Sequence, residues 1–136
     1  MAAIRIAACA MALCSASVIL GCDCVPKGSV KHSKKWSEIV FRGTITEIKD
    51  GTAFFHVERV WKGKVPRKFT MPALAEGAAC VGFWPSYLTT GNDLLVYASR
   101  LSKDGEYFTS VCDQTKPSSD AGEDFRKLGK GKPPVD

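Results

Sequence analysis

The chain has 136 residues, a length that suits one small globular domain and excludes a multidomain enzyme. Hydrophobic residues make up 45% and aromatic residues 10% of the sequence, which excludes a chain that is disordered throughout. The 19 Lys and Arg against 14 Asp and Glu give a net charge of +5, and the basic residues are scattered along the sequence. Charge alone therefore indicates no dedicated surface for nucleic acid or anionic lipid.

Residues 1–21 have the pattern of a signal peptide. Arg5 supplies a positive charge, an apolar stretch runs from Ile6 to Leu20, and polar residues begin at Asp23. The stretch is shorter than the about 20 apolar residues that a membrane-spanning helix needs. We therefore predict a signal peptide over residues 1–21, cleavage before Cys22 and export of the chain.

The sequence contains six cysteines, and their number constrains the exported chain. Removal of the signal peptide takes away Cys9 and Cys14. The cysteines that stay are Cys22, Cys24, Cys80 and Cys112. An even number of cysteines in an exported chain predicts disulfides, whereas the same residues in a cytosolic chain would suggest metal or redox chemistry. Three pairings are compatible with this count, and the count does not choose among them.

A second fate for Cys22 comes from the residues before it. The sequence Ile19-Leu20-Gly21-Cys22 resembles a bacterial lipobox, although Leu20 is larger than the residue usual at its position. A lipobox cysteine carries a thioether-linked lipid, which would anchor the chain in the bacterial envelope. One sulfur atom cannot hold both a lipid and a disulfide, so the two fates of Cys22 exclude each other.

The mature chain predicts a series of short strands. Residues 22–35 are poor in large apolar side chains and predict an extended segment that leads into one helical turn. Two β-rich runs follow, Val40–Ile48 and Ala53–Trp61, and Asp50-Gly51 between them is a hairpin signal. Three further strands are predicted at Lys68–Met71, Asp93–Ser99 and Glu106–Val111.

The end of the chain predicts a short helix over Ser119–Leu128, with Asp120 as its N-cap and Gly129 as its stop. Five short strands and a C-terminal helix favour an all-β fold, a five-stranded Greek-key barrel of the oligonucleotide/oligosaccharide-binding (OB) type. An open sandwich gives the same pattern of elements. We predict one domain over residues 22–129 and a flexible tail over residues 130–136.

Several short motifs make the mature chain resemble the N-terminal domain of tissue inhibitors of metalloproteinases. They are, in chain order, the N-terminal Cys22-Asp23-Cys24-Val25-Pro26, then Ile39-Val-Phe-Arg-Gly43, Val60-Trp-Lys-Gly63, Cys80-x-Gly82 and Leu94-Leu-Val-Tyr97. The resemblance covers nearly all of the mature chain. It implies an OB fold in which disulfides join Cys22 to Cys80 and Cys24 to Cys112.

The resemblance also implies a function. In that family the α-amine and carbonyl of the first cysteine chelate the catalytic zinc of a metalloprotease and displace its water. Cys22 would play this role, with residues 23–26 in the protease cleft. Asp23 would enter the specificity pocket, where the family has a small polar or hydroxylic residue, and an acid suits an apolar pocket poorly. The family's third bridge and its C-terminal domain have no counterpart here.

Catalytic motifs are not found in the sequence. There is no Ser/His/Asp or Cys/His order, no phosphate-binding glycine loop and no His-Glu-x-x-His stretch. We therefore predict a binding module that is not an enzyme and has no cofactor or metal of its own. His56 and Glu58 share one face of a strand, which an exposed polar face explains better than a metal site, and His32 stands alone.

Aromatic and basic residues raise two further alternatives. The aromatics Phe54, Phe55, Trp61, Phe83, Trp84 and Tyr87 suggest a stacking platform for nucleic acid, but export argues against that partner and core packing accounts for about half of them. We expect residues 83–87 to cover one end of the barrel, and to contact a partner if Cys22 is lipidated. The lysines at 27, 31, 34 and 35 predict a solvated face, or a face near a membrane surface if Cys22 is lipidated.

Overall fold

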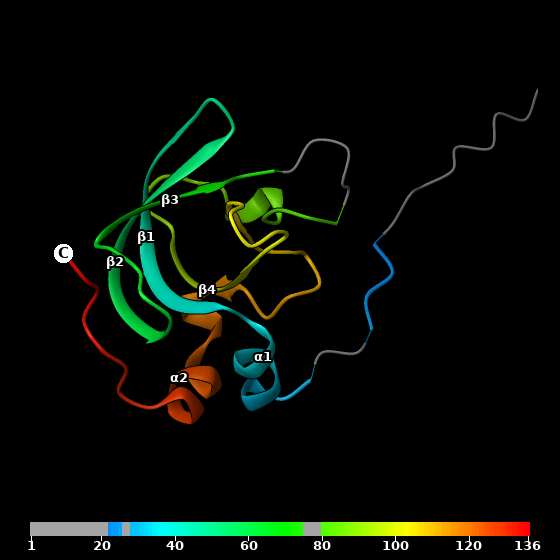
Figure 1. Cartoon of the computed structure of the whole chain (residues 1–136), viewed down its shortest axis with the longest axis vertical. Coiled ribbons are helices and arrows are strands. Elements are labelled where there is room, and N and C mark those ends of the chain that lie inside the picture. Colours follow the sequence, from blue (N-terminus) through cyan, green and yellow to red (C-terminus); the bar gives the residue numbers. More distant parts are fainter. Residues whose placement is uncertain (1–21, 26–27, 75–79) are drawn as a thin grey trace, which may run out of the picture.

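The computed structural model describes residues 22–25, 28–74 and 80–136 (Figure 1). The predicted signal peptide and Pro26 lie outside the described residues. Within the described part of the chain, no helix is long and apolar enough to cross a membrane.

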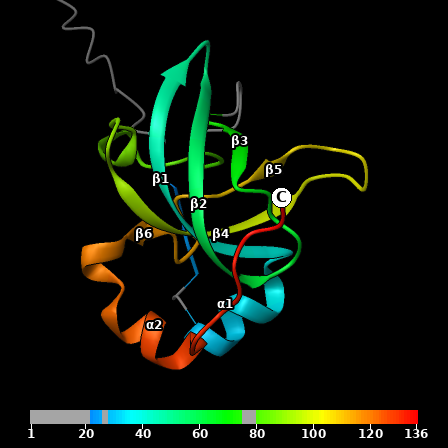
Figure 2. The same cartoon turned by 90° about the vertical axis from the view of Figure 1, so that its left-hand side faces the viewer.

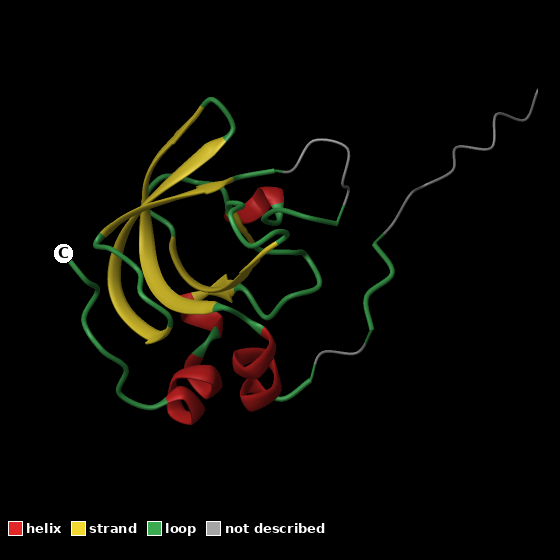
Figure 3. Cartoon of the chain, in the orientation of Figure 1, coloured by secondary structure: helices red, strands yellow, loops and turns green. Residues whose placement is uncertain are grey.

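A curled antiparallel sheet forms the body of the domain (Figures 1 and 3). Its strands are β1 (Ile39–Lys49), β2 (Thr52–Lys62), β3 (Lys68–Pro72), β4 (Asp93–Arg100), β5 (Tyr107–Phe108) and β6 (Lys116–Pro117). The strand order is β3-β2-β1-β4-β5, and β6 pairs with β4. The ring centroids of Phe69 on β3 and Tyr107 on β5 lie 6.0 Å apart and bring the two ends of the sheet together. The predicted all-β, barrel-like fold with a C-terminal helix is confirmed.

The β1–β2 hairpin forms where the sequence places it. Asp50 and Gly51 both have positive φ, 51° and 73°, the geometry that a tight hairpin turn requires. The register between β1 and β2 shifts at three points along β1, between Val40/Phe41, Arg42/Gly43 and Ile45/Glu47. Such shifts increase strand twist and bend, which lets a short sheet curl upon itself.

The sheet separates two apolar clusters. Inside the curl, side chains that include Phe41, Phe55 and Val96 are almost fully buried. On the outer face, Leu95 and Tyr97 pack with partly buried residues of the C-terminal helix. Alternate residues of β4 therefore face different clusters, which explains why the strand is apolar without interruption from Leu94 to Ala98 rather than alternating.

Two short helices lie side by side at one end of the barrel (Figures 1 and 2). α1 (Val30–Trp36) is longer than the single turn expected, and its N-cap Ser29 accepts a hydrogen bond from the His32 backbone N–H at 3.1 Å. α2 (Gly122–Leu128) begins later than predicted, because residues 118–120 form a separate 3-10 turn, η2. Asp120 was therefore wrong as the N-cap, whereas the stop at Gly129, with φ of 79°, is confirmed.

The predicted fifth strand was too long. β5 contains only Tyr107–Phe108, and Ser110 pairs instead with Val81 in an isolated bridge. The short β6, Lys116–Pro117, was not predicted, since two residues including a proline give no strand pattern.

The C-terminal segment is docked on the barrel, contrary to the predicted flexible tail. β3 pairs with β2 only from Thr52 to His56, so the later half of β2 has an edge beyond β3. Lys132 pairs with Val60 there through backbone hydrogen bonds of 2.8 and 2.7 Å, and the Val135 N–H donates to the Val65 carbonyl at 3.0 Å. The tail thus satisfies backbone groups that the sheet leaves open.

Candidate functional site

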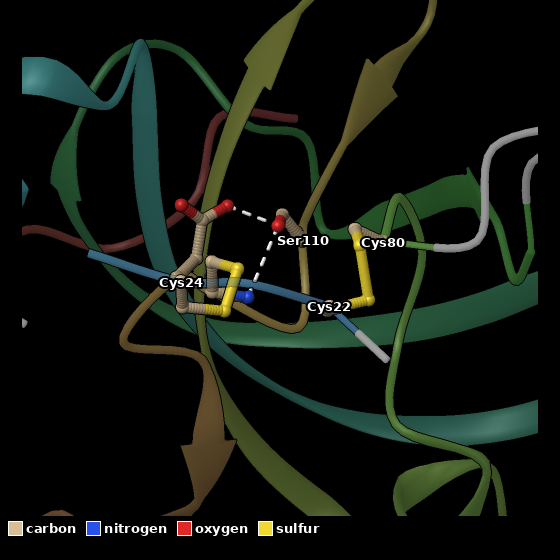
Figure 4. The surroundings of a disulfide bond; sticks show 6 residues. Cys22, Cys24, Cys80 and Ser110 are labelled. Carbon is tan, nitrogen blue, oxygen red and sulfur yellow. Dashed lines mark hydrogen bonds between the residues drawn. A yellow bond between two sulfur atoms is a disulfide. The ribbon is translucent and has the colours of Figure 1, made fainter. Parts of the chain in front are cut away.

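Two disulfides attach the N-terminal segment to the barrel (Figure 4). Cys22 is bonded to Cys80 and Cys24 to Cys112, with Cα–Cα distances of 5.4 and 5.3 Å. This is the pairing that the family resemblance implied, and it is confirmed. Disulfides of this kind indicate an oxidising, exported environment.

Cys80 and Cys112, to which the N-terminal segment is bonded, lie on neighbouring stretches of backbone. The Val81–Ser110 bridge lies beside both of them, and the Val111 N–H donates to the Cys80 carbonyl at 3.0 Å. The segments that carry Cys80 and Cys112 therefore run next to each other. Since Cys22 and Cys24 are only two residues apart, adjacent attachment points let an extended backbone reach both.

A turn over residues 110–113 positions Cys112. The Ser110 N–H donates to Asp113 Oδ2 at 2.9 Å, and the Cys112 N–H donates to Ser110 Oγ at 3.0 Å (Figure 4). Side chains thus satisfy backbone donors in this turn, as short polar residues commonly do. The second disulfide is built on a locally ordered loop.

The anchored segment is exposed. Asp23, Cys24 and Val25 are all solvent-accessible, Val25 at 82%, whereas Cys22 is half-buried. The structure therefore gives these predicted protease-binding residues an outward-facing surface on a backbone that two covalent bonds hold. Pro26, the last residue of the predicted set, is not among the described residues.

A polar network links the segment to α2. The Tyr97 hydroxyl donates to Asp124 Oδ2 at 2.8 Å, and Lys116 Nζ donates to Asp124 Oδ1 at 2.9 Å and to Gln114 Oε1 at 3.0 Å. The Gln114 amide in turn donates to the Gly28 carbonyl at 3.0 Å. Burial, followed by the hydrogen bond to Asp124, raises the pKa of Tyr97 well above its usual value, so this hydroxyl stays a donor at neutral pH.

One exposed apolar side chain near Cys80, Leu74, was not predicted as a site residue, whereas Trp84 lies in the 83–87 loop that was expected to contact a partner of a lipidated chain. Leu74 is 58% exposed and pairs with Gly82, and Trp84 is 45% exposed. Their neighbour Phe83 is buried in the barrel interior, so the expectation that this loop covers the barrel holds for Phe83 and not for Trp84. Nothing in a single sequence distinguishes an exposed leucine after a strand from a core residue.

The remaining candidate residues are either exposed on a strand or packed against other side chains of the domain. His56 and Glu58 are exposed on β2, and no group of three metal-binding side chains is found among the described residues. Trp61 stacks on Phe125 at 5.5 Å between ring centroids, and Trp61 Nε1–H donates to the Gly129 carbonyl at 2.9 Å. Phe55 is buried as well, so these aromatics pack within the protein.

No protein-family model and no curated protein matches this chain.

Proposed function

We propose that the chain is an exported, non-enzymatic inhibitor of zinc metalloproteases that acts through Cys22 after cleavage of the predicted signal peptide. The observation that carries this proposal is the Cys22–Cys80 disulfide. A bridged Cys22 has a sulfur that is already occupied, and its backbone is held against the barrel while the following residues are exposed. An N-terminus held in this way is suited to entering a cleft.

The proposed mechanism needs no catalytic residue. A neutral α-amine and the carbonyl of the same residue form a five-membered chelate with a metal ion. Bound to the protease zinc, they would replace the water that attacks the substrate. Zinc with three protein ligands has an open position for such a group.

The two bridges support tight binding for an entropic reason. A flexible N-terminus would lose its conformational freedom on entering a cleft, at a cost of about 1–2 kcal/mol for each ordered residue. Cys22 and Cys24 are joined to adjacent points of the barrel before any partner is present. Preorganisation of this kind raises affinity by reducing the cost of ordering on binding.

The test compares the mature chain that begins at Cys22 with a chain that carries one additional Ala before it. The addition converts the α-amine into an amide, which is a poor zinc ligand, so we expect inhibition of a responsive metalloprotease to fall at least 100-fold. A matched control carries the additional Ala after Asp136 and should inhibit like the mature chain. Equal inhibition by all three proteins would rule out chelation.

The second candidate function is that of a bacterial envelope lipoprotein, which the Ile19–Cys22 motif favours. Lipid on Cys22 would leave Cys80 without its disulfide and, with an acylated amine, would remove the zinc ligand. Asp23 would then resemble the signal that retains such lipoproteins in the inner membrane, and the barrel would bind its partner through residues 83–87 or serve a structural role. The mass of the native N-terminal peptide separates secreted or periplasmic protein from lipoprotein.

A further inference from the structure

The outer face of α1 combines positive charge with an exposed indole. Lys31 and Lys35 are one helical turn apart and both are exposed, and Trp36 is 69% exposed. Lys35 Nζ lies 6.0 Å from the centroid of the Trp36 ring. Val30 is the buried residue of this helix. The centroid of the Trp36 ring also lies 6.0 Å from that of the exposed His32 ring, and Trp36 belongs to neither buried cluster, so burial in the core does not explain it.

A groove next to α1 adds further positive charge. The cavity has a volume of about 460 Å³ and lies between the end of β2, α1 and the docked C-terminal segment. Its lysines are Lys34, Lys62, Lys64 and Lys132. No Asp or Glu of the described chain lines the groove, and none of these lysines forms an ion pair within that part of the chain.

The groove and the outer face of α1 are parts of one end of the molecule. Lys62 Nζ donates to the backbone carbonyls of Lys34 and Lys35 at 2.8 and 3.0 Å, which connects β2 directly to the last turn of α1. α1 and the start of the C-terminal segment lie at the same end of the barrel, opposite the tip of the β1–β2 hairpin (Figures 1 and 2). Lysines that are scattered in the sequence are therefore gathered in space.

We propose that this surface, defined by Lys31, Lys35, Trp36 and the four groove lysines, binds the face of an anionic phospholipid bilayer. Lysine ammonium groups are compact charges that attract anionic headgroups, and tryptophan favours the boundary between headgroups and acyl chains. A sulfated polysaccharide would bind the lysines and leave the indole of Trp36 in water. A bilayer would contact both the lysines and the indole, so it explains both features of the surface. The proposal goes beyond protease inhibition and does not depend on it.

The test measures sedimentation of the oxidised mature protein, which carries no lipid, with vesicles. We expect binding to vesicles of 30% phosphatidylglycerol in phosphatidylcholine, little binding to phosphatidylcholine alone, and release at high salt because exposed charges are screened. Each lysine near the surface contributes about fivefold to partitioning, so Lys35→Ala should lower it about fivefold and Lys31→Ala/Lys35→Ala about 25-fold.

The matched control is Lys49→Ala, at the far end of the β1–β2 hairpin, which removes the same charge and should leave binding unchanged. Vesicles should shift the tryptophan emission of the protein to shorter wavelength, and Trp36→Phe should remove that shift. An additional Ala before Cys22 should not alter vesicle binding, which separates this proposal from zinc chelation.

Three results would overturn the proposal. The first is equal binding to both types of vesicle, and the second is a loss with Lys49→Ala as large as that with Lys35→Ala. The third is retention on a sulfated polysaccharide resin without binding to anionic vesicles, which would assign the surface to a different polyanion.

Discussion

Removal of the Cys24–Cys112 disulfide should cost about 4 kcal/mol of unfolding free energy. The double substitution Cys24→Ser/Cys112→Ser opens this bridge without leaving an unpaired thiol. Cys24 and Cys112 are 88 residues apart, but the Cys22–Cys80 bridge provides a shorter covalent path between them. That path has an effective length of about 34 residues, for which the chain-entropy relation gives about 3.8 kcal/mol.

The same relation predicts the effect of opening the other bridge. With Cys24–Cys112 intact, the covalent path between Cys22 and Cys80 has the same effective length, although these cysteines are 58 residues apart in sequence. The two double-serine variants should therefore be destabilised to a similar extent. For a domain of this size, the loss corresponds to about 15 °C in Tm.

Thermal unfolding of the mature chain followed by circular dichroism measures this loss, and thiol titration verifies that the other bridge is intact. A Tm decrease below about 5 °C in either variant would contradict the reasoning, because loop closure would then not be the main contribution of that bridge. Unequal decreases, by 10 °C or more, would show that native contacts of one bridge outweigh chain entropy.

Two other predictions concern single side chains. Tyr97 has a raised pKa in the folded chain, so its ionisation favours the unfolded state. Its stabilising contribution should be complete below about pH 10 and should fall by about 1.4 kcal/mol for each pH unit above that value. Urea titrations across this range measure the free energy of unfolding. Tyr97→Phe should be less stable than the parent at pH 7, and its free energy of unfolding should fall less steeply above about pH 10 than that of the parent. An identical fall in both proteins would disprove the assignment to Tyr97. Asp23→Thr removes an exposed charge and should strengthen inhibition of metalloproteases with apolar specificity pockets, as measured by inhibition constants; weaker inhibition would place Asp23 in a polar or basic pocket.

The fold was predictable from the sequence where local signals were strong. Asp50-Gly51 and the β-rich runs around it specify the hairpin, and the hairpin fixes the sheet from which the barrel curls. The errors occurred where tertiary contacts decide the structure. Lys132 docks on the open edge of β2, and Val135 pairs with the connection between β2 and β3. No local pattern in the tail indicates either partner. Asp120 has the right residue type for an N-cap, yet η2 places Ala121 there.

The candidate site was predictable in part for a similar reason. Cysteine count and the resemblance together gave the pairing of Cys22 with Cys80 and of Cys24 with Cys112. The surroundings of the bridges depend on contacts between distant segments. Gln114 reaches Gly28 across 86 positions of sequence, and a lone glutamine gives no signal of such a partner.

The exposure of the N-terminal segment explains why its anchors must be strong. Val25 is 82% exposed and Asp23 is also exposed, so hydrophobic burial of these side chains holds the segment only weakly. An exposed backbone keeps one conformation only if other bonds restrict it, and two disulfides with the Gln114–Gly28 hydrogen bond provide such restraints. The same bridges lower the entropy of the unfolded chain. Stability of the barrel and presentation of the segment therefore depend on the same covalent bonds, and a variant that opens either bridge alters both.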